Sequence, residues 1–339
     1  MIFRMRIGTS SEKVQELRER LEREGIRTRL SPESARPIFA AVDKPPSGLM
    51  DELRADAAVE EIVVPRGAWQ LAARAFREKP QVVQIGNARI GGGEISIMAG
   101  PCSVDEHLEE AAAGVKAAGA QILRGGAYKP RTSPYSFQGY GVEGLRRLKD
   151  AGEANDLPVV SEIMDAAQLP AFIDHDIDCL QIGARNMQNF SLLKAVGTSG
   201  IPVLLKRGLA GTVDEWLYSA EYLLAFGCSQ VMLCERGIRT YETATRNTLD
   251  LTVLPLLREW THLPIVVDPA HAVGVARYIR PLARASIAAG ADGLTVEMHP
   301  NPKVARSDAD QALLPGELSA LVADARIMAA VTGKRLAKI

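Results

Sequence analysis

The chain has 339 residues, of which 47% are hydrophobic and 24% charged, enough apolar material for one large domain and a small one. Forty basic residues against forty-one acidic ones give a net charge of −1, which argues against a protein that coats nucleic acid or an anionic membrane. No stretch approaches the roughly 18 apolar residues of a membrane span, and the start lacks a signal-peptide core, so we expect a cytoplasmic protein. The four cysteines lack CxxC spacing and are expected to be reduced thiols.

Residues 1–66 are expected to form a small separate domain. Short apolar runs and amphipathic stretches alternate there in the order βαββαβ, which suggests a ferredoxin-like sandwich. We expect strands at 2–7, 27–30, 38–42 and 60–64, and helices at 10–24 and 48–54. The first helix should begin with a capping box formed by Thr9 and Glu12 and should end at Gly25.

Residues 67–93 are expected to form a linker with a helix and a β-hairpin. Apolar runs at 81–85 and 88–90 flank the turn pair Gly86 and Asn87, and three glycines at 91–93 follow. The second domain therefore starts at about residue 94.

Residues 94–339 carry eight apolar runs separated by helix-like segments. The runs lie at 95–99, 121–123, 158–163, 179–182, 202–205, 230–234, 264–267 and 293–296. Strands that alternate with helices imply a parallel sheet, and eight such units over about 245 residues fit a closed barrel better than an open sheet. The expected fold class is therefore α/β, a (β/α)₈ TIM barrel preceded by a small α+β domain.

Four side chains of metal-ligand type lie at the carboxyl ends of the expected strands, where the active site of a parallel barrel is found. Cys102, His271 and Glu297 end strands one, seven and eight, which become neighbours when the barrel closes, and Asp308 lies on the loop beyond, with Asp310 close by. Taken singly, Cys102 could equally be a buried structural thiol and His271 a hydrogen-bonded core histidine, instead of metal ligands. Together, this mixed donor set suits one divalent ion such as Mn²⁺, Fe²⁺, Co²⁺ or Zn²⁺.

A helix is also expected just after Cys102. Ser103 and Glu106 have the spacing of its capping box. The amino terminus of that helix would then help to stabilise the Cys102 thiolate.

Six cationic side chains lie at or just past strand ends in a chain whose total charge is almost zero. They are Arg124, Lys129, Arg131, Arg185, Lys206 and Arg236. Such focusing implies polyanionic substrates, because arginine matches the oxygens of phosphate and carboxylate bidentately. Six cationic side chains are better matched by two phosphorylated ligands than by one. For Arg207 and Arg239, surface solvation is as good an explanation as binding.

These motifs closely resemble the 3-deoxy-D-arabino-heptulosonate-7-phosphate (DAHP) synthase family, in its type I beta subgroup of small chains with an amino-terminal ferredoxin-like extension. The resemblance covers essentially the whole chain and rests on AGPCSV at 99–104, LRGGAYKPRTSPYSFQG at 123–139, QIGARN at 181–186, LLKRG at 204–208, LCERGIRT at 233–240, VDPAH at 267–271 and VEMHP at 296–300. Relatives usually carry Ser and Gly in place of Ala270 and Ala272. The resemblance implies condensation of phosphoenolpyruvate with D-erythrose 4-phosphate and water, the first step of the shikimate pathway to the aromatic amino acids.

The resemblance also implies the roles of the site residues. The metal ligands would be Cys102, His271, Glu297 and Asp308, and phosphoenolpyruvate would be bound by Arg124, Lys129, the backbone around Ala184, Arg185, Lys206 and Arg236. The sugar phosphate would meet Arg131, Thr132 and Arg185. Lys129 is expected to protonate the new alkoxide, with Glu162 or a water on the metal as candidate base, while Cys102 and His271 act through the metal.

By the same resemblance, the amino-terminal domain would sense tyrosine or phenylalanine and restrain the enzyme. A structural or oligomerisation role is the alternative for this domain. We further expect a homotetramer, with no nucleic-acid or membrane partner.

Three other functions are consistent with part of the sequence. The octulosonate-phosphate synthases, which use arabinose 5-phosphate, share the barrel, but the KPRTS segment at 129–133 favours erythrose 4-phosphate. A Schiff-base aldolase would use Lys129 or Lys206 as nucleophile and would leave the metal-ligand candidates unexplained. A non-catalytic amino-acid sensor with a relic barrel is disfavoured by the intact strand ends.

Overall fold

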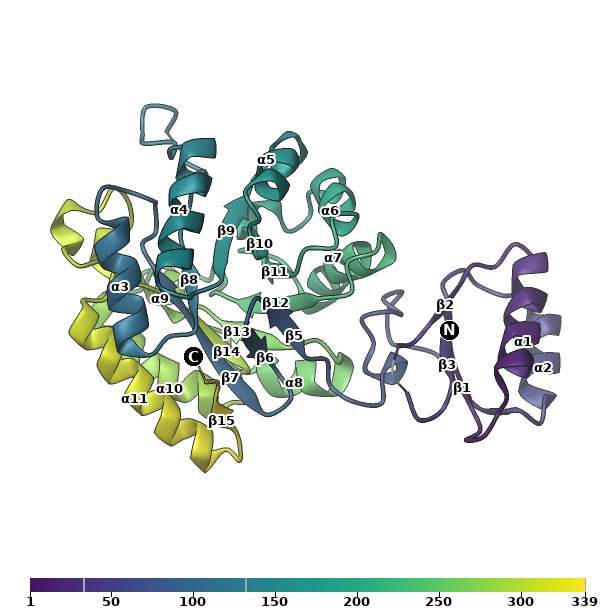
Figure 1. Cartoon of the computed structure of the whole chain (residues 1–339). Coiled ribbons are helices and arrows are strands. Elements are labelled where there is room, and N and C mark those ends of the chain that lie inside the picture. Colours follow the sequence, from purple (N-terminus) through teal and green to yellow (C-terminus); the bar gives the residue numbers. More distant parts are fainter. Residues whose placement is uncertain (33, 132, 339) are drawn as a thin grey trace. The chain divides into compact units, whose positions relative to one another are not determined.

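The computed structural model describes residues 1–32, 34–131 and 133–338 and divides the chain into two compact units (Figure 1). Unit 1 comprises residues 1–81 together with 257–263, and unit 2 comprises residues 82–256 and 264–339. The first part of the expected linker, up to Gln81, therefore groups with the amino-terminal residues. No helix in the described residues is long and apolar enough to cross a membrane.

Unit 1 has the element order that the sequence predicts. Its elements are β1 (Ile2–Met5), α1 (Ser11–Arg23), β2 (Thr28–Leu30), β3 (Ile38–Ala41), α2 (Ser47–Ala55), β4 (Val59–Val63) and the 3₁₀ turn η1 (Arg74–Phe76). The four strands form one antiparallel sheet in the order β2-β3-β1-β4, and both helices cover the same face of it (Figure 1). Alternate strand residues point to that face. Phe3 of β1 and Phe39 of β3 stack there with ring centroids 4.7 Å apart, and Leu17 and Leu21 of α1 belong to the same core.

The expected start of α1 was wrong in its detail. Ser10, with extended backbone angles, is the N-cap, and its Oγ accepts a hydrogen bond from the backbone N–H of Lys13 at 3.2 Å. Thr9 instead donates its hydroxyl to the carbonyl of Arg6 at 2.8 Å. Two adjacent hydroxyl residues compete for one cap, and local turn bonding decides which of them takes it.

Unit 2 contains the eight barrel strands that the sequence predicts. They are β7 (Glu94–Gly100), β8 (Ile122–Arg124), β9 (Val159–Ile163), β10 (Cys179–Ile182), β11 (Val203–Lys206), β12 (Val231–Glu235), β13 (Ile265–Val267) and β14 (Gly293–Glu297). Each strand pairs in parallel with the next, and β14 pairs back with β7, so the sheet is closed. Both faces are covered, which explains why the strand sequences are apolar throughout. A short final strand, β15 (Arg335–Leu336), pairs with the start of β7.

Helices surround this sheet and connect its strands (Figure 1). They are α3 (Leu108–Ala118), α4 (Val142–Ala154), α5 (Leu169–Asp174), α6 (Phe190–Gly197), α7 (Val213–Ala225), α8 (Val253–Trp260), α9 (Pro269–Val273), α10 (Ile279–Ala288) and α11 (Pro315–Val331). Short 3₁₀ turns lie between them at η2 (Ala166–Gln168), η3 (Ala184–Asn186), η4 (Ala276–Tyr278), η5 (Pro302–Val304) and η6 (Ala309–Gln311).

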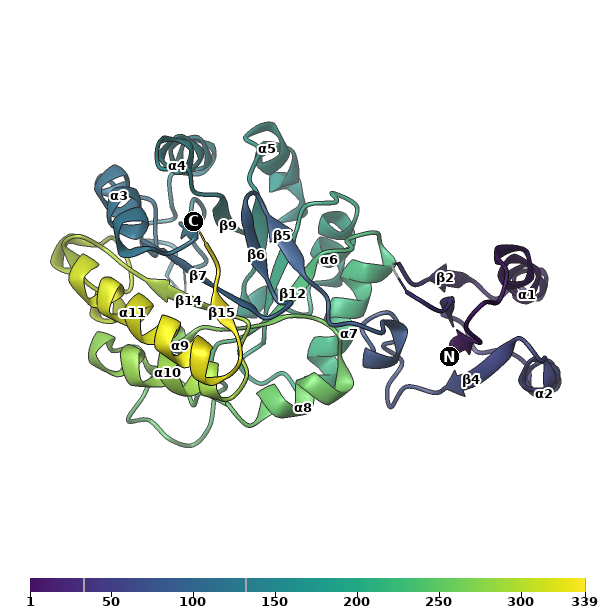
Figure 2. The same cartoon turned by 60° about the horizontal axis from the view of Figure 1, so that its bottom comes forward.

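A β-hairpin closes one end of the barrel. Strands β5 (Val83–Ile85) and β6 (Ala88–Ile90) pair antiparallel around the expected turn and lie against the barrel in Figure 2. Val83, Ile85 and Ile90 are fully buried in one apolar cluster with residues of the barrel strands, among them Ile122 and Met232. The amino-terminal end of the barrel is thus filled with hydrocarbon, and the polar strand ends gather at the opposite, carboxyl end.

Candidate active site and metal centre

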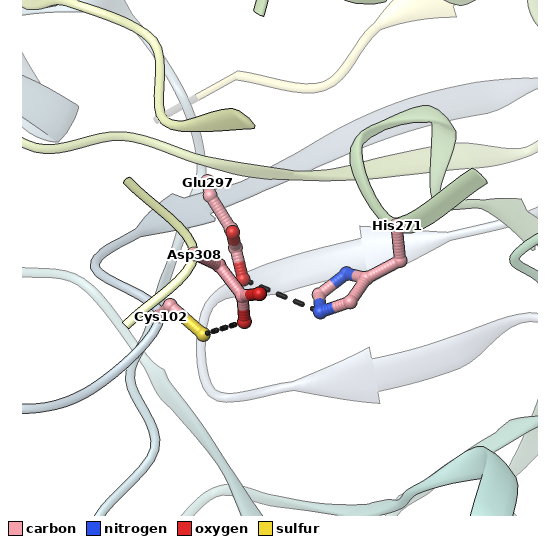
Figure 3. Close-up of side chains that lie close together, drawn as sticks. All are labelled: Cys102, His271, Glu297 and Asp308. Carbon is pink, nitrogen blue, oxygen red and sulfur yellow. Dashed lines mark hydrogen bonds and ion pairs between the residues drawn. The ribbon is translucent and has the colours of Figure 1, made fainter. Parts of the chain in front are cut away.

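Four side chains converge at the carboxyl end of the barrel (Figure 3). Cys102 follows β7, His271 lies on α9 after β13, Glu297 ends β14, and Asp308 lies on the loop beyond it. One donor atom of each lies within 4.8 Å of the others. Two ligands about 2.0–2.3 Å from one ion can be at most about 4.6 Å apart. The four donors lie close to this limit, so only small side-chain movements would let all of them reach a single divalent ion.

Asp308, and not Asp310, belongs to this group among the described residues. Its backbone lies in the left-handed region, with φ of 49°, which aspartate tolerates better than most residues. This turn directs Oδ2 of Asp308 to within 2.9 Å of the Cys102 sulfur.

Burial dominates the electrostatics of Cys102. It raises the pKa of this thiol to about 12, and the neighbouring Glu297 carboxylate acts in the same direction. A cation bound at the sulfur favours the thiolate and opposes that shift. For Asp308, burial acts upward, but the hydrogen bond from Cys102 and the charges around it hold the pKa below its usual value. The two pKa shifts indicate that Asp308 is ionised before a metal ion binds, whereas Cys102 would lose its proton when the ion binds.

The helix expected just after Cys102 begins later than predicted. Helix α3 starts at Leu108, and its N-cap, His107, makes no side-chain capping bond. Ser103 Oγ instead lies 2.6 Å from Ser307 Oγ, while a carboxylate oxygen of Glu106 accepts the hydroxyl of Tyr140 at 2.7 Å. The expected capping residues thus join neighbouring loops, and no helix terminus stabilises the thiolate in the way predicted.

His271 is oriented by the residue that begins its helix. Asp268 caps α9: its Oδ1 accepts the backbone N–H of His271 at 2.9 Å, and its Oδ2 lies 2.7 Å from Nδ1 of the ring. Because a carboxylate oxygen only accepts, we assign the ring proton to Nδ1, which leaves Nε2 facing Glu297 at 3.4 Å. The same Oδ2 also accepts from Lys206 Nζ at 2.6 Å. Asp268, which the sequence analysis did not single out, therefore joins a metal-ligand candidate to a cation of the cavity.

A cavity of about 470 Å³ lies beside the four ligand candidates. Its wall contains the expected residues Arg124, Lys129, Arg131, Glu162, Ala184, Arg185, Lys206, Arg236, His271 and Asp308. Thr132 lies outside the described residues. The wall also contains residues that the sequence analysis left open or missed, namely Gln181, Leu209, Arg239, Arg246 and Asn247. Leu209, Arg239, Arg246 and Asn247 lie in loops, where the sequence pattern does not indicate which side chains face the cavity, whereas Gln181 lies within β10 in an otherwise apolar run.

Four of these cations are buried, which is costly for an unpaired charge. Three of them contact an anionic or thiol group: Arg124 donates to Glu297 at 3.1 Å, Lys129 to the Cys102 sulfur at 2.9 Å, and Lys206 to Asp268. The fourth, Arg236, donates within the described chain only to the carbonyl of Gly237 at 3.5 Å, and burial lowers its pKa. A bound oxyanion would supply the counter-charge that Arg236 lacks.

Two further side chains are fixed near this cavity. Glu162 accepts a hydrogen bond from Gln181 at 3.1 Å, and any side chain at Gly183 would collide with it, because a Cβ there would lie 2.0 Å from Glu162 Oε1. Arg207 is buried and pairs with Glu235 at 3.0 Å and Asp250 at 2.9 Å, so it is not a solvated surface residue.

Fold and site together define a (β/α)₈-barrel enzyme with a candidate divalent-metal centre beside an anion-binding cavity. Residues 73–334 match the model of the DAHP synthetase I family. The chain is 42% identical over 315 residues to the phospho-2-dehydro-3-deoxyheptonate aldolase of Thermotoga maritima, with 92% of this chain and 93% of that protein covered. This chain therefore belongs to the DAHP synthetase I family.

Solved structures agree with this assignment, and a second group of relatives is named for an octonate substrate. The crystal structure of the Thermotoga maritima phospho-2-dehydro-3-deoxyheptonate aldolase (DAHP synthase) superposes with a TM-score of 0.78 at 40% identity, covering 99% of each chain. A truncated form of 3-deoxy-D-arabino-heptulosonate 7-phosphate synthase from the same organism gives 0.74 at 42% identity, covering 80% of this chain and 100% of that one. The 2-dehydro-3-deoxyphosphooctonate aldolase of Koribacter versatilis is 31% identical over 277 residues, covering 74% of this chain and 96% of that protein.

Replacing Asp268 by Asn should weaken metal binding. The amide offers one acceptor where three donors now meet two carboxylate oxygens, so the ring of His271 loses its fixed orientation. Partners that orient a metal-bound histidine typically contribute about 10–100-fold in metal affinity. We expect a loss of that size in the Mn²⁺ dissociation constant of the metal-free protein, measured by competition with a chelator.

Asp310→Asn is the matched control, because Asp310 is close in sequence to a ligand candidate but is not part of the four-residue group. Its affinity for Mn²⁺ should equal that of the unchanged protein. Equal affinities for both variants would show that Asp268 does not orient the histidine.

Proposed function

We propose that this chain condenses phosphoenolpyruvate with D-erythrose 4-phosphate and water to give DAHP and phosphate. The observation that carries the proposal is the position of the four ligand candidates, which adjoin a cavity whose wall is crowded with cations. A reaction between a carbonyl substrate and a second substrate, both phosphorylated, is consistent with that combination. Membership of the DAHP synthetase I family supports the same reaction.

The donor set suits one divalent ion. A thiolate, an imidazole and two carboxylates are too soft a set for Mg²⁺ or Ca²⁺ and favour Mn²⁺, Fe²⁺, Co²⁺ or Zn²⁺. Cys102, His271, Glu297 and Asp308 would hold it. When bound, such an ion supplies Lewis-acid polarisation of the aldehyde oxygen of the sugar phosphate.

The buried cations are suited to phosphoenolpyruvate. Arg124, Lys206 and Arg236 are shielded from water, where their attraction for an oxyanion is stronger than at the surface. Arg185 and the backbone of Ala184 complete this part of the wall. Arg131 lies in the same wall and would meet the sugar phosphate, together with Arg185 and Thr132.

Lys129 is suited to donate a proton. Burial acts to lower the pKa of its ammonium group, but the interaction with the Cys102 sulfur and with the carboxylates of Glu162 and Glu297 more than offsets this and raises the pKa above its usual value. The ammonium group is held 2.9 Å from both the sulfur and the carbonyl oxygen of Cys102. It would protonate the alkoxide that forms when C3 of the enolpyruvate attacks the aldehyde.

A carboxylate is available for the hydration step. After carbon–carbon bond formation, water adds at C2 and the adduct loses phosphate by C–O cleavage. Glu162 lines the cavity and is oriented by Gln181, so it would accept the proton of that water. Lys206 and Arg236 would hold the departing phosphate.

Phosphate release tests the reaction directly. We expect release from phosphoenolpyruvate with erythrose 4-phosphate, loss of release after chelation, and recovery with added Mn²⁺. A preference for arabinose 5-phosphate would instead indicate the octulosonate-phosphate reaction. Trapping of a covalent adduct by borohydride would favour a Schiff-base aldolase, and no release with either sugar would support a non-catalytic sensor.

Replacing Lys129 by Met separates proton donation from binding. The variant should still bind phosphoenolpyruvate, because Arg124, Lys206 and Arg236 remain, while turnover should fall by about 10²–10⁴-fold, the usual contribution of a positioned acid. Binding is followed by calorimetry and turnover by phosphate release. A normal rate with normal binding would remove Lys129 from the acid role.

We also infer that the amino-terminal domain senses tyrosine or phenylalanine and that the chain assembles as a homotetramer. The family match begins only at residue 73, so the first 72 residues are additional to the part that the family shares. Among the described part of those 72 residues there is no ligand candidate and no residue of the cavity wall. A separate regulatory task for them is consistent with this division, and binding of an effector must differ between two arrangements of the enzyme to restrain it.

Inhibition by tyrosine or phenylalanine should therefore depend on this domain. We expect slower phosphate release from the full chain when either amino acid is added, and no such effect on a chain that starts at residue 67. Equal inhibition of the two would place the effector site elsewhere, and sedimentation of the full chain would determine its assembly state.

A further inference from the structure

Each acidic ligand candidate of the metal centre is paired with one cation. Lys129 donates to Cys102 Sγ at 2.9 Å, and Arg124 donates to Glu297 Oε1 at 3.1 Å. The third pair was not expected: Arg246 Nη1 donates to Asp308 Oδ1 at 2.9 Å. Lys129 and Arg124 already have proposed roles toward the substrate, whereas the third cation has none.

The backbone at this arginine and at the residue that follows it is hydrogen-bonded to the helix that carries His271. Residue 246 lies in the loop between β12 and α8, and its N–H donates to the carbonyl of Val273 at 3.2 Å. Asn247 donates its backbone N–H to the carbonyl of Ala272 and its side-chain amide to that of His271, at 2.6 and 2.9 Å. The loop is therefore attached to α9 at three points and places Arg246 beside Asp308.

A buried glutamine connects Arg246 to a second carboxylate. Gln311, which is 2% exposed, accepts from Arg246 Nη1 at 2.8 Å through Oε1 and donates to Glu297 Oε2 at 2.7 Å through Nε2. This amide orientation follows from its partners, since guanidinium only donates and carboxylate only accepts. Arg246, Gln311 and the two carboxylates thus form one continuous chain of hydrogen bonds.

These hydrogen bonds engage one oxygen of each carboxylate and leave the other oxygen turned toward the remaining ligand candidates. Glu297 Oε2 is engaged by Gln311, while Oε1, which also accepts from Arg124 at 3.1 Å, faces His271 Nε2 at 3.4 Å. Asp308 Oδ1 is engaged by Arg246, while Oδ2 faces Cys102 Sγ at 2.9 Å. In both carboxylates, the oxygen turned toward the other ligand candidates is the one that Arg246 and Gln311 do not contact.

We propose that Arg246 and Gln311 are positioning residues of the metal centre, which turn Asp308 and Glu297 so that each presents a single oxygen to the ion. The inference rests on the proposed metal-dependent function. It concerns metal affinity and therefore has a readout that does not require turnover. Outer contacts of this kind typically contribute about 10–100-fold to metal affinity.

Charge and position have opposite effects on metal binding, which makes the test sharp. Removing the positive charge of Arg246 should by itself favour a divalent cation, because like charges repel. Losing the orientation of Asp308 should disfavour it. Gln311→Met removes the two hydrogen bonds at nearly constant size without any change of charge, so it isolates the positioning effect.

The experiment measures Mn²⁺ dissociation constants of the metal-free full chain by chelator competition. Gln311→Met and Arg246→Met should each bind Mn²⁺ about 10–100-fold more weakly, and Arg246→Lys, which keeps a donor for Asp308, should recover part of the loss. Arg239→Met is the matched control: it removes an arginine of the same cavity wall that makes no ion pair with the ligand carboxylates in the described residues, and its affinity should be unchanged or slightly higher.

Two further readouts separate positioning from other effects. In Co²⁺-loaded protein, the thiolate-to-metal absorption of Cys102 should persist in both variants, because the sulfur is not released. At saturating Mn²⁺, kcat should recover substantially while the Mn²⁺ requirement stays raised. Thermal unfolding of the metal-free variants checks folding, and Arg246, whose side chain is 38% exposed, keeps the test available if the buried Gln311 variant does not fold.

Native Mn²⁺ affinity in a folded Gln311→Met or Arg246→Met variant would overturn the proposal. So would native Mn²⁺ affinity with a raised KM for one substrate, which would make Arg246 a substrate-binding residue instead. If the unchanged protein bound Mn²⁺ tightly, and the variants weakly, without any release of phosphate from phosphoenolpyruvate, the positioning role would stand and the proposed reaction would fail.

Discussion

The parallel pairing of β14 with β7 is the constraint on which the site depends. It joins the last barrel strand to the first and places Glu297 opposite Gly100, two residues before Cys102. Residues almost two hundred positions apart in the sequence thereby become neighbours at one end of the barrel. Pairing of β13 with β14 then brings the segment that leads to His271 alongside. Without closure, the thiol and the carboxylate would lie at opposite edges of an open sheet, and the cations of the cavity would have no common centre.

Local charge balance is the second organising feature. The chain as a whole is nearly neutral, yet its carboxyl-end cavity collects many cations, several of them buried. Burial of charge is tolerated where partners are close, and here the partners are largely the ligand candidates themselves. Lys206 and His271 share one oxygen of Asp268, so the phosphate-binding side and the metal side of the cavity are linked through a single carboxylate. A change of occupancy on one side alters the electrostatic environment of the other.

Much of this could be read from the sequence, and the reasons for success and failure differ. The eight strands were found because strands buried on both faces are apolar along their whole length, and the ligand set because its members fall at strand ends whose relative positions follow from barrel closure. Asp268, Gln311 and Arg246 were not found, because their importance lies in which atoms they reach, and that depends on loop conformation and rotamer. The capping box at Ser103 and Glu106 failed for the same reason: bonds to Ser307 and Tyr140, distant in the sequence, replaced the local pattern.

Because the hairpin of β5 and β6 covers only one end of the barrel, the two ends tolerate different kinds of amino-acid substitution. At the end that the hairpin closes, Ile85 and Ile90 belong to a buried apolar cluster, where apolar replacements of similar volume and shape are tolerated best. At the carboxyl end, a small displacement of one polar atom breaks a contact on which the reaction depends, whereas the size of a loop has little effect. Substitutions in the apolar amino-terminal end and in the carboxyl-end loops can therefore accumulate almost independently. The barrel can keep its stability while the chemistry of its site changes.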